Sequence, residues 1–257
     1  MNRPKKSLGQ NFLIDHNITR KILGLKKIYK KNVFEIGPGR GAITDKIIEE
    51  KPNSLILIEK DKTLLDQLKI KYRKEKFIEY LNEDILKINI EKKIKKNTII
   101  FGNLPYNISS QILIKFLKFK KWPPDFTDLI LMFQKEVAEK ITGESYGRLS
   151  IITNYRLKII NKFYISSNCF YPKPKVNSSI LHLSPVIKNS IKIKNINNLE
   201  NITNIFFSNK RKMIKKNLEK IFNEKQIKKF NNLNQNSRPS DLEKEFYYRA
   251  VEILEND

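Results

Sequence analysis

The chain has 257 residues, 40% of them hydrophobic, which is enough for one large domain with a buried core and a smaller second unit. Lysine and arginine number 51 against 27 aspartates and glutamates, a formal net charge of +24 that predicts binding to a polyanion. No apolar run approaches the roughly 20 residues that a membrane span needs, so a membrane partner is excluded.

The basic start of the chain leads into no apolar signal core, so we expect a cytoplasmic protein. The single cysteine, Cys169, excludes an internal disulfide and a cysteine-cluster zinc site. Residues 1–31 form an N-terminal arm. Within it, Gln10–Leu13 mixes amide and apolar side chains, which favours a segment that folds back over another part of the protein. A helix is expected from Asp15 to Leu25.

A strand, a glycine-rich turn and a helix follow in that order. The predicted strand Asn32–Ile36 precedes Gly37-Pro38-Gly39-Arg40-Gly41, which is typical of the nucleotide-binding opening of a doubly wound α/β sheet. A second strand, Ser54–Ile58, ends in Glu59, 22 residues after Gly37. An acid at about that spacing accepts hydrogen bonds from ribose hydroxyls, so Glu59 is predicted to bind a ribose.

The ligand of this turn is predicted to be S-adenosylmethionine rather than a dinucleotide. The glycine spacing is G-P-G-R-G and not G-x-G-x-x-G, and Glu35 stands at the end of the first strand. A carboxylate near the turn suits a cation that has no phosphates.

The next two strands add polar residues at the same edge of the sheet. The predicted strand Phe77–Leu81 leads to Asp84, which either accepts from an adenine amine or caps a helix. The strand beginning at Thr98 leads to Asn103-Leu104-Pro105-Tyr106. These residues combine an amide, a rigid proline and an aromatic ring at a strand end, and we expect them to hold an adenine while its amine receives a methyl group.

Further elements complete the predicted sheet. Helices are expected at Ile108–Phe119 and Lys135–Ile141, with a strand at Leu129–Phe133 between them and a final strand pair at Phe163–Ile165 and Ser179–Leu183. The loop Phe170–Val176 lies between the paired strands. Its two prolines stiffen the backbone and present aromatic and basic side chains, so a substrate-binding role is predicted.

The composition changes near Pro185 and predicts two domains, residues 1–186 and 187–257. A linker over Ile187–Asn198 should lead into three helices near residues 199–222, 224–232 and 238–255. The first of these helices carries a cluster of basic residues with few acids, which favours a nucleic-acid contact over a solvated face. The cluster consists of Lys210, Arg211, Lys212, Lys215 and Lys216.

Taken together, these motifs resemble the small-subunit ribosomal RNA adenine N6,N6-dimethyltransferase family of S-adenosylmethionine-dependent methyltransferases. The resemblance spans nearly the whole chain in the family's order. The matching segments are Lys6–Leu13, Glu35–Gly39, Asn103–Tyr106, Tyr146–Ser150, Phe170–Val176 and Asn209–Lys212.

The resemblance implies a Rossmann-like, mostly parallel seven-stranded sheet and a smaller all-helical C-terminal domain that contacts rRNA. It implies that S-adenosylmethionine binds at Asn11, Leu13, Gly37, Glu59, Asp84 and Asn103, with Glu59 on the ribose and Asp84 on the adenine amine. The target adenine would lie among Asn103, Leu104, Pro105, Tyr106 and Phe170.

The implied reaction is dimethylation of two adjacent adenosines near the 3′ end of small-subunit rRNA. A monomer acting on a pre-small-subunit particle, with a role in ribosome biogenesis and no metal, is therefore expected. The segment Arg238–Leu242 matches the family's pattern only loosely, which affects the expected RNA docking and not the chemistry.

Three other functions share parts of this pattern. The large-subunit rRNA adenine methyltransferases have a similar Asn-aromatic motif. The exact residues of Gly102–Tyr106 and of Phe170–Val176 nevertheless favour the small-subunit enzymes. A non-catalytic rRNA-binding assembly factor, or a transcription factor, could keep the same fold, although Glu59, Asp84 and Asn103 are all present. A dinucleotide oxidoreductase is opposed by the glycine spacing.

Overall fold

The computed structural model describes residues 4–5, 8–230 and 233–256, which fold into two compact units. The first unit comprises Met1–Ala138 and Lys158–Pro185, and the second comprises Glu139–Leu157 and Val186–Asp257. The domain border predicted at residue 186 thus lies where the chain passes for the second time from the first unit to the second. Residues 139–157 join the C-terminal helices because α6 (Arg148–Arg156) packs against α7 (Ile196–Phe207) and α10 (Lys244–Asn256).

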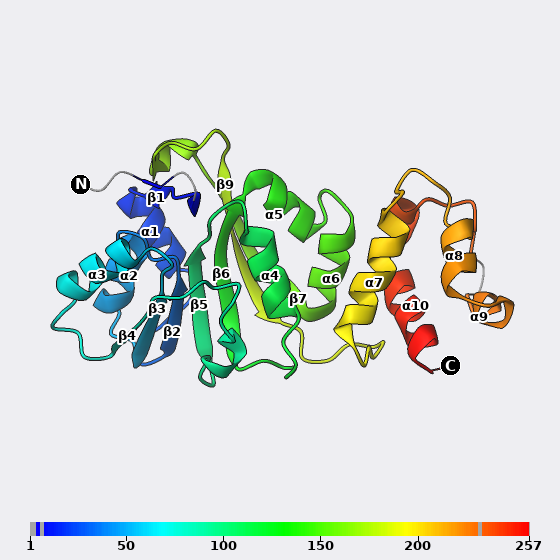
Figure 1. The fold of residues 1–257 in the computed structure, drawn as a ribbon, viewed down its shortest axis with the longest axis horizontal. Helices are drawn as coiled ribbons and strands as arrows, with labels where there is room; N and C mark the ends of the chain where they lie inside the picture. Colours follow the sequence, from blue (N-terminus) through cyan, green and yellow to red (C-terminus); the bar gives the residue numbers. More distant parts are fainter. Residues whose placement is uncertain (1–3, 6–7, 231–232, 257) are drawn as a thin grey trace. The chain divides into compact units, whose positions relative to one another are not determined.

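The first unit is built on a seven-stranded sheet of strand order β4-β3-β2-β5-β6-β9-β7 (Figure 1). The strands β4, β3, β2, β5 and β6 are parallel, and β9 runs antiparallel to β6. This arrangement confirms the predicted doubly wound, mostly parallel seven-stranded sheet. The strands are β2 (Asn32–Ile36), β3 (Ser54–Ile58), β4 (Ile78–Leu81), β5 (Thr98–Asn103), β6 (Phe126–Gln134), β7 (Leu157–Ile165) and β9 (Ser178–Pro185).

Buried apolar residues explain the central strands. Residues Val33–Ile36 and Leu55–Ile58 are buried without interruption, as strands covered on both faces of a parallel sheet must be. The connecting helices contribute further apolar residues to the same core, such as Ile22, Ile47 and Leu68. The helices of this unit are α1 (His16–Leu23), α2 (Ala42–Glu49), α3 (Lys62–Lys71), α4 (Ser109–Leu117) and the first half of α5 (Lys135–Thr142).

A separate two-stranded ribbon joins the N-terminal arm to the loop before β9. Strand β1 (Phe12–Leu13) pairs antiparallel with β8 (Phe170–Tyr171), so that Leu13 lies opposite Phe170. The arm therefore folds back over the first unit, as predicted. Two residues of the predicted arm motif, Lys6 and Ser7, lie outside the described residues.

The second unit is helical and contains α6, α7, α8 (Lys215–Ile221), α9 (Glu224–Lys228) and α10. The segment Tyr146–Ser150 caps α6 there: the Ser150 hydroxyl accepts from the Gly147 amide at 3.2 Å, and the Tyr146 hydroxyl donates to the Leu242 carbonyl at 2.8 Å. In the described part of the chain, no helix is long and apolar enough to cross a bilayer.

The predicted helix over residues 199–222 is wrong in its middle. It ends at Phe207, and a turn over residues 208–212 separates it from α8, so Lys210, Arg211 and Lys212 lie on this turn and Lys215 begins the next helix. The amides of Ile214 and Lys215 donate to the carbonyls of Ser237 and Gln235 instead of continuing α7. Contacts distant in sequence therefore override the local helical pattern.

The neighbouring predictions need smaller corrections. Residues 238–255 form a short 3-10 turn, Pro239–Asp241, before α10 begins at Lys244. The predicted linker over 187–198 ends early, because α7 begins at Ile196 with Asn195 as its cap. The strand expected at Phe163–Ile165 begins already at Leu157.

Candidate active site

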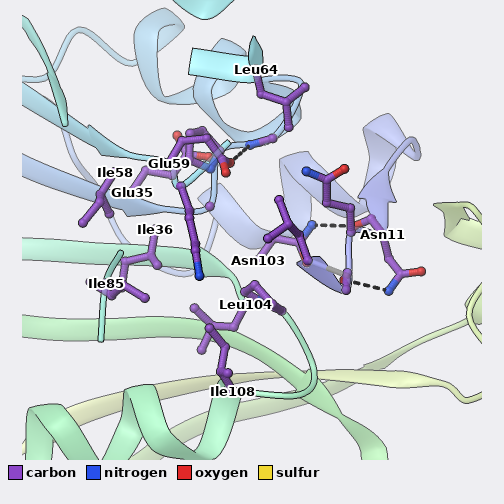
Figure 2. Close-up of a pocket in the computed structure, with 18 of the residues that line it drawn as sticks. Asn11, Glu35, Ile36, Ile58, Glu59, Leu64, Ile85, Asn103, Leu104 and Ile108 are labelled. Atoms are coloured by element: carbon purple, nitrogen blue, oxygen red, sulfur yellow. Dashed lines mark hydrogen bonds between the residues drawn. The ribbon is translucent and has the colours of Figure 1, made fainter. Parts of the chain in front are cut away.

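A pocket lies where the parallel strands β2, β3 and β5 end, and the N-terminal arm forms one of its walls (Figure 2). Ligands of open α/β sheets bind at this edge. Most of the predicted site residues line it, including the residues that the resemblance assigns to the cofactor. The lining residues that carry the argument are Asn11, Leu13, Glu35, Gly37, Glu59, Asp84, Asn103, Leu104, Pro105 and Tyr106.

The glycine turn leaves backbone exposed to the pocket. Gly37 and Gly39 have φ of +65° and +58°, which side chains of L-residues rarely adopt. A Cβ on Gly37 would lie 3.2 Å from the Asn103 carbonyl oxygen, and one on Gly39 would lie 3.0 Å from the Phe12 ring. Glycine is therefore needed both for the backbone conformation and for the close approach of the strand end and the arm.

Glu59 is held at the edge of this turn. One of its carboxylate oxygens accepts from the Gly39 amide at 3.3 Å and the other accepts from the Asp61 amide at 2.9 Å. Burial raises the pKa of Glu59, and the two amide hydrogen bonds partly oppose that effect. A carboxylate oriented in this way, with further lone pairs facing the pocket, fits a pair of ribose hydroxyls.

Glu35 is fully buried beside Glu59, as Figure 2 shows. Its carboxyl accepts from the Thr44 hydroxyl at 2.6 Å. Burial raises its pKa to about 8, with a further contribution from the nearby Asp45 and Glu59 carboxylates. A cation bound nearby would oppose this shift and favour the ionised carboxylate, as the sulfonium and ammonium groups of the predicted S-adenosylmethionine would.

The pH dependence of stability should report the buried Glu35. Its pKa is about 8 in the folded state against 4.5 for an ordinary glutamate, so the folded chain keeps a proton that the unfolded chain releases. The free energy of unfolding must then fall as pH rises from about 4.5 to 8, by a few kcal/mol at most. Thermal melts at pH 5 to 8.5 should show wild type losing stability relative to Glu35→Gln, and parallel curves would contradict the assignment.

Asn103 receives its orientation from the arm. Its Nδ2 donates to the Asn11 carbonyl at 3.0 Å, a bond drawn in Figure 2. Because a carbonyl can only accept, the NH₂ group must face Asn11, and Oδ1 is then the part of the amide available to accept from a substrate. The backbone contact at Asn11 was not foreseen from the sequence, because no local pattern marks a carbonyl 92 residues away.

The residues after Asn103 are fixed as well. Leu104 is 2% exposed, and the Pro105 carbonyl accepts from the Ile108 amide at 3.1 Å where α4 starts. The Tyr106 hydroxyl is 2.5 Å from the Ser178 hydroxyl on β9. Burial raises the pKa of Tyr106, so the ring stays neutral near pH 7 and can stack on a base.

Asp84 caps a turn, which is one of the two roles that the sequence left open, and its role towards an adenine amine stays a prediction. One oxygen accepts from the Leu86 amide at 2.9 Å and so caps the turn that follows β4, while the other lies 3.0 Å from the Lys60 ammonium. The Leu86 amide, followed by the Lys60 ammonium, holds the pKa of Asp84 below its usual value. Asp84 is therefore an ionised acceptor, and it lines the pocket while it caps the turn.

Phe170 does not line the pocket in this structure. Its ring is 3% exposed and lies in the hydrophobic core with Leu13 and Ile165. The neighbouring Tyr171 is exposed, and the Arg40 guanidinium lies 4.5 Å from the Phe12 ring centroid and 5.8 Å from that of Tyr171. The stacking role of Phe170 therefore stays a prediction.

The arm is anchored close to Glu59 by Asp61, a residue that the sequence did not single out. Its carboxylate accepts from the Lys5 ammonium at 2.9 Å and from the Gln10 amide at 3.0 Å. Burial acts to raise its pKa, but these two donors hold it below the ordinary value. The arm is thus fixed at two points, Asp61 and Asn103, on either side of the pocket.

Comparison with known proteins places this site in a family. The family model described as "Ribosomal RNA adenine dimethylase" matches residues 1–256. The "Ribosomal RNA small subunit methyltransferase A" of Pelagibacter ubique is 42% identical over 99% of this chain and 98% of its own length. The protein of the same name from a Wolbachia of Drosophila simulans is 39% identical, covering 93% of this chain and 89% of its own.

Solved structures agree with the fold. A dimethyladenosine transferase from Plasmodium falciparum has a TM-score of 0.73 and 25% identity, over 93% of this chain and 95% of the other. The 23S rRNA methyltransferase ErmE has a TM-score of 0.70 at 22% identity, over 95% of this chain and all of its own, and shows the shared fold. As the sequence motifs predicted, the chain belongs to the ribosomal RNA adenine dimethylase family and is an rRNA adenine dimethyltransferase.

Proposed function

We propose that this enzyme transfers methyl groups from S-adenosylmethionine to the exocyclic amines of two adjacent adenosines near the 3′ end of small-subunit rRNA. The curated relatives at 42% and 39% identity carry the small-subunit name, which supports that substrate over the large subunit. The single observation that carries the chemistry is the oriented amide of Asn103 in a pocket that also contains Glu59 and Asp84. The reaction would take place in the cytoplasm, on a pre-small-subunit particle and by a monomer.

The pocket residues fit the parts of the methyl donor. Glu59 would accept from the ribose hydroxyls, and Asp84 would accept from the adenine amine of the donor. Ile58, Ile85 and Ile108 line the pocket as apolar surfaces for the adenine ring (Figure 2). Glu35 and the glycine turn would take the charged methionine end. When bound, the donor supplies a methyl group on a positively charged sulfur.

The target amine needs help because its lone pair is delocalised into the adenine ring. The Asn103 Oδ1 and the Leu104 carbonyl would accept hydrogen bonds from its two hydrogens and favour a pyramidal nitrogen. Positive charge develops on that nitrogen, so each bond strengthens in the transition state and supplies about 1.5–3 kcal/mol. Attack is in line with the bond that breaks, which makes positioning the main contribution of the chain.

Holding the base requires an aromatic surface as well as acceptors. Tyr106, which lines the pocket, would stack on the extruded adenine, at about 1–3 kcal/mol, and so offset part of the cost of unstacking it. No general base is needed, because the methylated ammonium is acidic enough to lose its proton to water. The absence of a histidine or cysteine from the lining residues is consistent with this chemistry.

The proposal is tested by transfer of a labelled methyl group to unmethylated small and large ribosomal subunits, followed by nucleoside mapping. We expect dimethyladenosine in small-subunit rRNA at two adjacent positions. Methylation of the large subunit alone would favour the function named for ErmE. Tight particle binding without transfer would favour a non-catalytic assembly factor.

The basic turn after α7 should contribute to RNA binding. Lys210, Arg211 and Lys212 are exposed side by side on it. Changing the three to glutamine should weaken binding to the particle and make its dependence on salt shallower, by about two to three in the slope of log K against log salt. Filter binding at several salt concentrations measures both.

A matched variant separates this contact from a general effect of charge. Lys92, Lys95 and Lys96 are also exposed, and they precede β5 at the end of the sheet opposite to the pocket. Changing these three to glutamine removes the same charge and should leave the slope nearly unchanged. If the slopes of log K against log salt were equal for the two triple variants, the basic turn would be an ordinary solvated surface and not an RNA contact.

A further inference from the structure

Lys115 is a half-buried cation on α4, the helix that directly follows the Asn103–Tyr106 motif. Its ammonium donates to the Leu86 carbonyl at 2.7 Å and to the Ile88 carbonyl at 2.6 Å. Both acceptors belong to the turn after β4, 27 to 29 residues away in sequence. Lys115 therefore bridges two segments that meet at the pocket.

The two acceptors are carbonyls at the C-terminal end of this turn, and the Ile88 carbonyl also accepts from the Ile90 amide at 3.0 Å, so Lys115 uses its second lone pair. The turn is short and helix-like: the Asp84 carbonyl accepts from the amides of Lys87 and Ile88, and the Asp84 side chain caps it at Leu86. The last carbonyls of a helical turn have no partner inside it. A cation placed there gives each of these carbonyls a charged donor and opposes the negative end of the turn.

The same turn forms one wall of the pocket. Its residues Glu83–Leu86 line the cavity, facing the lining residues Leu104 and Ile108 that stand before and at the start of α4. Figure 2 shows Ile85 on the same side of the pocket as Ile58, with Leu104 and Ile108 below. The two walls are therefore joined on their outer side by Lys115, while a ligand would lie between them.

The pKa of Lys115 reflects both its burial in this contact and the nearby charge of Asp84. Burial lowers the pKa of Lys115, and the nearby Asp84 carboxylate opposes that shift. The carboxylate and the ammonium thus stabilise each other across the turn, in addition to the direct hydrogen bonds.

We propose that Lys115 is a positioning residue for the methyl donor: it fixes the turn that carries Asp84 and Ile85, and so sets the enzyme's affinity for the adenine end of S-adenosylmethionine. The inference rests on the proposed function, since it takes the donor's adenine to lie against this turn. Lys115 touches neither the donor nor the target base. Its effect should therefore appear in donor binding and not in the methyl-transfer step.

The experiment compares wild type with Lys115→Met, which keeps the length and apolar character of the stem but removes the donor. Calorimetry with S-adenosylhomocysteine should show a roughly 5- to 20-fold weaker affinity, from the loss of a charge-assisted tether. KM for S-adenosylmethionine should rise by a similar factor, whereas kcat at saturating donor and KM for the particle should change less than twofold. Lys115→Arg should restore most of the affinity.

Two further measurements separate positioning from general loosening of the fold. S-inosylhomocysteine lacks the 6-amino group that Asp84 would bind, so Lys115→Met should lose much less affinity for it than for the adenosyl compound. The combination with Asp84→Asn should be no weaker than Asp84→Asn alone by more than about twofold. Lys118→Met, at an exposed position where the same helix ends, is the matched control and should bind like wild type.

The outcomes distinguish this inference from the function on which it rests. Equal losses for the adenosyl and inosyl compounds, or a fall in kcat with unchanged affinity, would overturn the positioning role while leaving the methyltransferase intact. Unchanged affinity in Lys115→Met would do the same. A wild-type protein that binds no S-adenosylhomocysteine at all would instead overturn the proposed function.

Discussion

Asn103→Ala should reduce methyl transfer to small-subunit particles by about 10- to 150-fold at saturating donor. In the proposed reaction the side-chain oxygen of Asn103 would accept from an amine that becomes positively charged, and a hydrogen bond of that kind is worth about 1.5–3 kcal/mol in the transition state. Affinity for S-adenosylhomocysteine should fall only a few-fold, because the lost bond to the Asn11 carbonyl contributes about 1 kcal/mol to the order of the arm. Single-turnover transfer and calorimetry measure the two effects separately.

Asn161→Ala, on an exposed part of β7, is the matched control and should retain wild-type transfer. A transfer rate near wild type in Asn103→Ala would show that the amide does not orient the target amine. A loss of transfer that is fully recovered by more donor would move Asn103 from the reaction to donor binding.

Glu59→Ala should weaken the binding of S-adenosylhomocysteine by about 100-fold or more. The change removes the acceptor proposed for the ribose hydroxyls. It also leaves the amides of Gly39 and Asp61 without their partner, so the glycine turn loses its support. Two or three charge-assisted hydrogen bonds together account for about 3 kcal/mol or more. Calorimetry with the wild type and the variant tests this prediction.

Glu59→Gln separates the two parts of that loss. Glutamine keeps the shape and one acceptor oxygen, so its affinity should lie between those of wild type and alanine. Glu79→Ala, at an exposed position on β4, should bind normally. Unchanged affinity in Glu59→Ala would remove this carboxylate from the donor site.

The parts of the fold that follow from local pattern were predictable. Uninterrupted apolar runs such as Leu55–Ile58 predict strands covered on both faces, and a polar residue after each run predicts the edge at which ligands bind. These two rules bring Glu59, Asp84 and Asn103 to one pocket without any knowledge of the rest of the chain. The positions of glycine then predict where the backbone approaches the ligand.

The features that the sequence does not predict arise from contacts between distant residues. The break between α7 and α8 is set by carbonyls near residue 236, and the burial of Phe170 is set by its pairing with Leu13. The raised pKa of Glu35 depends on how many atoms cover it, which no motif encodes. From the sequence, Lys115 is indistinguishable from a surface lysine, because its contact with the turn at Leu86 depends on the tertiary structure.

The two anchors of the N-terminal arm have a consequence for the timing of catalysis. The same segment forms a wall of the pocket and accepts from the Asn103 Nδ2, which leaves Oδ1 for the target amine in the proposed reaction. Two methyl groups on one amine require that the spent donor be replaced once between them, and any opening of the arm for that exchange also releases Asn103. If the arm opens for that exchange, the Asn103 amide would be oriented again only when the arm closes, and transfer would wait for fresh donor.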